Sequence, residues 1–206
     1  MATKDKKIGK QTVKLENPPK IISTYSIVGP KEGDGPLRKY FHKIISDDTL
    51  GKDSFEKAES EMMYTAIREA IKGANLTEDK IDYLFAGDLL NQITSSSFAA
   101  RELNIPFIGL YGACSTMSES LSMASLFLDG GFGNYIVAST SSHFSSQASA
   151  ERRPQQYISL SRTGKIIARY GTAFVGMIVV STFSKNSLSC SSVKRRGSAL
   201  FVYGME

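Results

Sequence analysis

IPFIGLYGACSTMSESLSMASLFLDGG, residues 105–131, contains the junction that decides the fold. Its first nine residues are apolar throughout, which is typical of a strand buried on both faces of a sheet. From Thr116 onward, small and apolar residues lie on most sides of a helical pattern that ends at Gly130 and Gly131. The stretch predicts a buried strand followed by a buried helix, with Cys114 between small residues at the junction.

The same alternation of apolar strand patterns and helix patterns runs through the preceding and following residues. We predict strands in KIISTYSIVGP (20–30), YLFAG (83–87), IPFIGLYGA (105–113) and NYIVASTSS (134–142), and helices from an N-cap at Ser54 to a C-cap at Gly73, in SSSFAARELN (95–104) and in TMSESLSMASLFLDGG (116–131). KEGDGPL (31–37) is predicted to be a polar loop. Apolar strands separated by helical crossovers imply an α/β fold with a mostly parallel sheet covered on both faces.

Charge divides the chain into unlike parts. Residues 1–144 carry 16 Lys and Arg against 18 Asp and Glu, whereas residues 145–206 carry 9 against 2 and include 12 serines. No aromatic residues are interleaved with the basic ones, so we expect no nucleic-acid binding. We predict an irregular, lysine-rich leader arm over residues 1–20 and one α/β unit over residues 21–144. For residues 145–206 we favour an aberrant tail, frame-shifted or otherwise altered, over a basic loop with one strand in TAFVGMIVVSTF (172–183).

The cysteine and histidine content limits the chemistry. Two cysteines, Cys114 and Cys190, provide no disulfide framework, and with two histidines there is no metal-ligand cluster, so no metal and no cofactor are expected. The N-terminus lacks the apolar core of a signal peptide, and the longest apolar run is far shorter than the roughly 20 residues of a spanning helix. These features predict a cytoplasmic protein in a reducing compartment.

Polar side chains follow the predicted strands, where α/β sheets usually place their sites. A helix N-terminus directed at Cys114 would favour its thiolate and make it a nucleophile, but a buried, inert thiol is an equally good interpretation. His143 is a candidate base or a packed imidazole. Asp88 and Asn91 either line a pocket or cap a helix. The three stretches concerned are AGDLLNQ (86–92), YGACSTM (111–117) and ASTSSHF (138–144).

These motifs resemble those in the N-terminal half of thiolase-fold proteins, in which the active cysteine lies at a strand-to-helix junction. A closer resemblance is to the stage V sporulation protein AD family of endospore-forming bacteria. It is carried by GKQTV (9–13), GPKEGDGPL (29–37), LTEDKIDYLFAGDLLNQ (76–92), IPFIGLYGACST (105–116) and LDGGFGNYIVASTSSH (128–143). The resemblance implies half of a thiolase-like αβαβα layered fold. It also implies a truncated chain of doubtful activity, because the family's chain is longer and has a second half.

The family resemblance further implies a binding protein for dipicolinic acid (pyridine-2,6-dicarboxylate), acting in uptake of dipicolinate into the forespore. Other proteins of the stage V sporulation A operon would be its partners, and a homodimer at or near the forespore membrane is expected. Cys114 would be a pocket residue, with His143, Asp88 and Asn91 as further ligand-binding candidates. The main alternative is an acyltransferase or ketoacyl synthase that uses Cys114 on acyl thioesters. A structural part that folds only with a partner is the third hypothesis.

Overall fold

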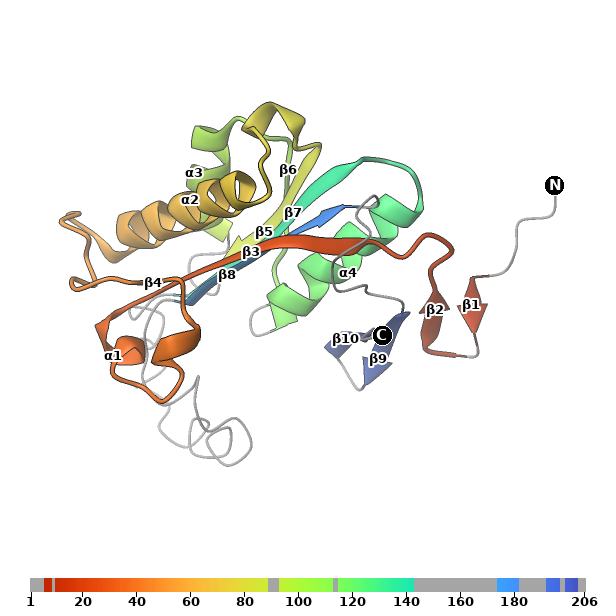
Figure 1. Cartoon of the computed structure of the whole chain (residues 1–206), viewed down its shortest axis with the longest axis horizontal. Coiled ribbons are helices and arrows are strands. Elements are labelled where there is room, and N and C mark those ends of the chain that lie inside the picture. Colours follow the sequence, from red (N-terminus) through yellow and green to blue (C-terminus); the bar gives the residue numbers. More distant parts are fainter. Residues whose placement is uncertain are drawn as a thin grey trace.

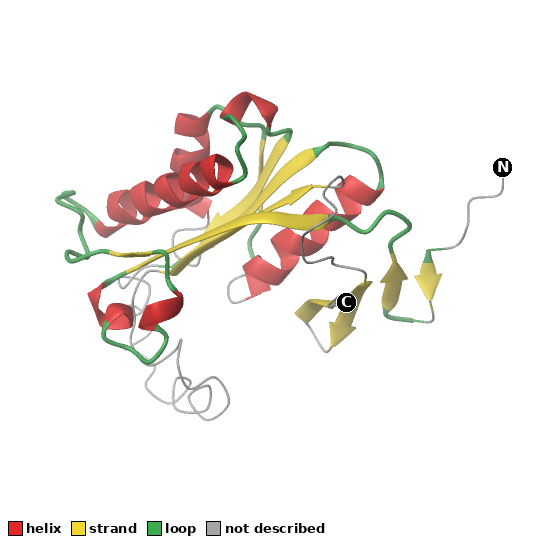
Figure 2. Cartoon of the chain, in the orientation of Figure 1, coloured by secondary structure: helices red, strands yellow, loops and turns green. Residues whose placement is uncertain are grey.

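The computed structural model describes residues 6–8, 10–88, 93–112, 115–142, 174–181, 192–196 and 199–203. Beyond residue 173 only the course and pairing of the strands are described. A six-stranded sheet forms the centre, with helices on both of its faces (Figure 1, Figure 2). The α/β fold class is therefore confirmed.

The strand order of the central sheet is β4-β3-β8-β7-β5-β6. Its strands are Lys20–Val28 (β3), Lys43–Ile44 (β4), Tyr83–Asp88 (β5), Phe107–Gly109 (β6), Tyr135–Ser141 (β7) and Phe174–Ser181 (β8). β5 is parallel to both β6 and β7, and β3 is parallel to β4, as expected for strands joined by helical crossovers. β8 runs antiparallel between β3 and β7 and lies within TAFVGMIVVSTF, where the less favoured interpretation of the tail placed one strand.

Two helices cover one face of the sheet. They are α2 (Phe55–Gly73) and α3 (Thr94–Leu103). Ser54 caps α2 as predicted, because its hydroxyl accepts a hydrogen bond from the Lys57 amide at 3.3 Å. Gly73 is not the C-cap: it is the last helical residue, and Asn75 adopts the left-handed conformation (φ 55°) that ends the segment.

The opposite face is covered by α4 (Thr116–Asp129), the helix predicted after the decisive junction. Successive side chains of β5 alternate between the two faces. Leu84 packs in the core beneath α2 and α3, and Phe85 packs in the core beneath α4. The apolar strand predicted in YLFAG is therefore buried from both sides.

The leader arm and the predicted polar loop are more regular than expected. Lys7–Ile8 (β1) and Thr12–Lys14 (β2) pair antiparallel and form a small sheet with Ser192–Arg196 (β9) and Ala199–Tyr203 (β10). The arm is attached to the end of α4, where the Asp129 carboxylate accepts hydrogen bonds from Lys6 Nζ and the Asn17 amide, each at 2.6 Å.

Within KEGDGPL, a short helix, α1 (Pro30–Gly33), replaces part of the loop because proline is well accepted in a first helical turn. Single 3-10 turns occur at Arg38–Tyr40 and Glu78–Lys80. The rest of the predicted tail, residues 145–173, 182–191, 197–198 and 204–206, lies outside the described residues. Over the described part of the chain, no helix has both the length and the apolar character needed to cross a membrane.

Candidate functional site

β5 and β7 are adjacent parallel strands, and their C-terminal ends lie side by side at the same end of the central sheet. Asp88 and Ser141, the last residues of these strands, are partners in the parallel register. The segment after β6 reaches the same end, where the Leu110 amide donates to the Ala86 carbonyl at 2.8 Å. All three polar stretches singled out in the sequence therefore leave the sheet at one place.

Gly87 allows this convergence. A Cβ atom there would overlap the Leu110 carbonyl oxygen and lie 2.9 Å from Thr116 Cγ2. Because backbone atoms cannot swing aside as a side chain can, glycine is required for this close approach. The end of β5 is thus packed directly against the residues that lead into α4.

Of the four predicted site residues, Asp88 is described, and it is fully buried. Its carboxylate accepts hydrogen bonds from the Ile93 amide (3.2 Å), the Ser96 amide (3.0 Å) and the Ser96 hydroxyl (2.8 Å). The side chain therefore binds the N-terminal turn of α3, the capping role considered above. Whether it also contacts a ligand stays a prediction.

Cys114, His143 and Asn91 lie outside the described residues. Cys114 and His143 each have one described neighbour in the chain, whereas both neighbours of Asn91 lie outside the described residues. Ser115 follows Cys114, and Ser142 precedes His143. The roles of these three residues stay predictions, and the converging strand ends show that the described residues nearest to them in the chain approach the same region.

A tight turn leads into α4. The Ser115 amide and hydroxyl both donate to the Gly112 carbonyl, at 3.0 and 2.7 Å. The Gly112 amide donates to Thr116 Oγ1 at 3.2 Å. A Cβ at Gly112 would lie 2.6 Å from Ser115 Oγ and would overlap the Glu119 carboxylate. This turn leads directly into the N-terminus of α4, the end of a helix that favours an anion.

Glu59 is a buried carboxyl that the sequence analysis missed. It lies on α2, is 0% exposed, and accepts a hydrogen bond from Ser141 Oγ at 2.6 Å. Its other oxygen, Oε2, is buried and has no hydrogen-bond partner among the described residues. Burial raises the pKa of Glu59 to about 7; the nearby charges of Asp88 and Glu56 also raise it, while the Ser141 hydrogen bond opposes the shift.

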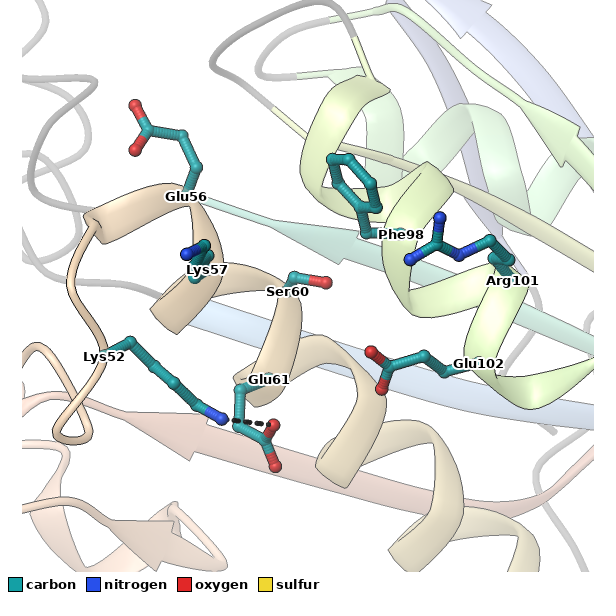
Figure 3. Close-up of a pocket in the computed structure, with 8 residues that line it drawn as sticks. All are labelled: Lys52, Glu56, Lys57, Ser60, Glu61, Phe98, Arg101 and Glu102. Carbon is teal, nitrogen blue, oxygen red and sulfur yellow. Dashed lines mark ion pairs between the residues drawn. The ribbon is translucent and has the colours of Figure 1, made fainter.

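A groove of about 300 Å³ lies on the outer side of α2 and α3, and it contains none of the four predicted site residues. It is lined by Lys52, Glu56, Lys57, Ser60, Glu61, Phe98, Arg101 and Glu102 (Figure 3). Basic and acidic side chains alternate there, and Lys52 already pairs with Glu61 at 3.2 Å. The mixture gives no preference for a dianion. Within the described residues there is also no group of three or more side chains that could hold a metal ion.

Comparison with known families assigns the chain. A profile of the family described as stage V sporulation protein AD matches residues 9–193. The chain belongs to this family. Stage V sporulation protein AD of Bacillus subtilis (strain 168) is 43% identical over 149 residues, which are 72% of this chain and 44% of the relative. The chain thus spans less than half the length of that relative. The family match continues past residue 145, and the altered origin of the tail stays a prediction.

Comparison with solved structures of other proteins shows that this chain has a thiolase-like fold. 3-Oxoacyl-[acyl-carrier-protein] synthase III from Aquifex aeolicus matches with a TM-score of 0.52 and 19% identity, over 82% of this chain and 55% of its own. OleA from Xanthomonas campestris, bound with cerulenin, matches with a TM-score of 0.62 and 14% identity, over 89% and 63%. At these identities the likeness concerns the fold alone.

Proposed function

We propose that this chain carries the dipicolinate-binding region of a stage V sporulation protein AD. The observation that carries the proposal is membership of this sporulation family, together with the convergence of its strand ends beside the N-terminus of α4. Dipicolinate is a flat, rigid dianion. A narrow site among backbone amides suits such a ligand, because oriented amides supply positive potential without a basic side chain.

In this proposal Cys114 lines the pocket and is not a nucleophile. The amides at the start of α4 receive a carboxylate of the ligand. His143 and Asn91 supply further polar contacts from the other two segments. Asp88 holds the first turn of α3 in place.

The biological setting follows from the same proposal. The protein acts in the uptake of dipicolinate into the forespore, together with other proteins of the stage V sporulation A operon. It works in the cytoplasm or at the surface of the forespore membrane, and the full-length protein is a homodimer. Size measurement by light scattering tests the last point, because a monomeric full-length protein would contradict it.

Thermal unfolding of the purified chain tests the binding proposal. It is measured with dipicolinate and with two controls, benzene-1,3-dicarboxylate and benzoate. A ligand that binds only the folded state stabilises it by about 2.7 kcal/mol at a concentration 100 times Kd. We expect dipicolinate to raise the transition more than either control, and Cys114→Ala to reduce the rise. A chelator is added to all samples, since dipicolinate binds metal ions. Equal shifts with all three acids, or none, would refute specific binding.

The likeness to ketoacyl synthases favours one second candidate, an acyltransferase that uses Cys114. Incubation with an acyl thioester followed by mass spectrometry distinguishes the two. A covalent acyl group that disappears in Cys114→Ala would support the enzyme. An unmodified Cys114 in a chain that binds dipicolinate would support the binding protein.

A further inference from the structure

Two buried carboxyls lie beneath the edge where β5 and β7 end. Glu59 comes from α2 and Asp88 from β5, and both are 0% exposed. No ion pair joins either carboxyl to a described cation. Burial of a carboxylate without a cation disfavours its charged form, so hydrogen bonds must supply the compensation.

The hydrogen bonds distinguish the two groups. Asp88 accepts two backbone amides and one hydroxyl at the start of α3, an arrangement that stabilises a carboxylate. Glu59 accepts one hydroxyl, from Ser141, and its second oxygen has no described partner. Glu59 is therefore the group that carries the proton when one is bound.

Charged groups near Glu59 come from two elements. β5 contributes Asp88 and α2 itself contributes Glu56, and both are acidic. β7 contributes the hydroxyl of Ser141, and α3 contributes Ser95, whose hydroxyl donates to the Glu56 carbonyl at 3.4 Å; both hydroxyls lower the pKa of Glu59. Burial and the two acidic neighbours outweigh them and favour the neutral form of Glu59, and a further negative charge nearby would favour that form more strongly.

Ser141 links Glu59 to the strand end beside the proposed ligand site. It is the last residue of β7 and the register partner of Asp88, and His143 follows two positions later. We propose that Glu59 is a positioning residue of the dicarboxylate site, which holds the end of β7 through Ser141 and takes up a proton when a dianion binds beside it. This inference rests on the proposed dipicolinate site and adds a proton-coupled residue to it.

A bound dianion that raises the pKa of Glu59 by about one unit changes ligand binding measurably. Glu59 begins at about 7. Ligand affinity would then fall about fivefold between pH 6 and pH 8. At pH 7 the protein would take up about 0.4 proton for each ligand that it binds.

Isothermal titration of the full chain with dipicolinate tests whether Glu59 takes up a proton on binding. It is carried out at pH 6, 7 and 8, in buffers of different ionisation heat. Glu59→Gln should still bind, but its affinity should lose the part of the pH dependence that comes from Glu59, and its proton uptake should fall by about 0.4. Glu61→Gln is the matched control, the same substitution on the outer face of α2, and should keep the full dependence. Comparing the variants with the parent chain isolates the contribution of Glu59 from that of other titrating groups.

Ser141→Ala provides a second variant in case Glu59→Gln binds poorly. The Ser141 hydrogen bond lowers the pKa of Glu59, so its removal should move the pH dependence upward. Binding with identical pH profiles in the parent chain, Glu59→Gln and Ser141→Ala would overturn the inference while leaving the binding proposal intact. Absence of dipicolinate binding at every pH would overturn both.

Discussion

Replacement of Glu59 by glutamine should make the free energy of unfolding less dependent on pH. The pKa of this carboxyl rises from 4.5 to about 7 on folding, because the side chain is buried. A raised pKa means that the folded state binds the proton more tightly, so this stabilising contribution is present at low pH and is lost as the pH rises through 7. Glutamine has nearly the same shape and cannot titrate.

The two pKa values give the magnitude of the effect. Between pH 5 and pH 8 the parent chain should lose about 2–3 kcal/mol of stability through Glu59 alone, since each pKa unit corresponds to about 1.4 kcal/mol. Urea denaturation at both pH values measures the difference between the parent chain and Glu59→Gln. That difference should move by about 2–3 kcal/mol in favour of the variant at pH 8.

Glu61→Gln again serves as the control, because Glu61 is partly exposed and pairs with Lys52. Its stability relative to the parent chain should change little between the two pH values. A constant difference between the parent chain and Glu59→Gln would refute the reasoning, because it would mean that Glu59 has the same pKa in the folded and unfolded states.

Three further substitutions test the packing around the site. Ser96→Ala should lower the free energy of unfolding by about 1–3 kcal/mol, because buried Asp88 loses its 2.8 Å hydroxyl donor; exposed Ser97→Ala should change it by less than about 0.5 kcal/mol in the same urea titration. Gly87→Ala should cost about 1–3 kcal/mol, since the added methyl group overlaps a backbone carbonyl, and an unchanged denaturation midpoint would contradict this close approach. Met62→Ala should cost about 2–5 kcal/mol by opening a cavity under α2; a smaller loss in calorimetry would show that the core closes around it.

Helices and parallel strands could be predicted because their residues repeat at the spacing of a buried face. Ala58, Met62, Ala66 and Ala70 are all buried on α2, as their spacing indicates. Short elements such as α1 have no such repeat, and their formation depends on local turn chemistry. The pairing of β8 between two distant strands also has no local signal, since an antiparallel neighbour is chosen by tertiary packing.

The candidate site was only partly predictable. Asp88 was found because it ends an apolar strand, a position that local sequence reveals. Glu59 was missed because an isolated glutamate is usually exposed. A signal was available: Glu59 is spaced three, four and seven residues from Met62, Met63 and Ala66, on the buried face of the helix. Identifying its partner Ser141 required the fold.

The position of β8 has a consequence for how the protein folds. β8 separates β3 from β7, so the first long strand of the sequence joins the rest of the sheet through residues 174–181. Pairings between such distant segments form slowly, because a large loop must close first. During synthesis, β3 waits with an unpaired edge until almost the whole described sheet has been made, and that edge can pair with other chains. Yield of folded protein should therefore depend on the supply of chaperones during translation.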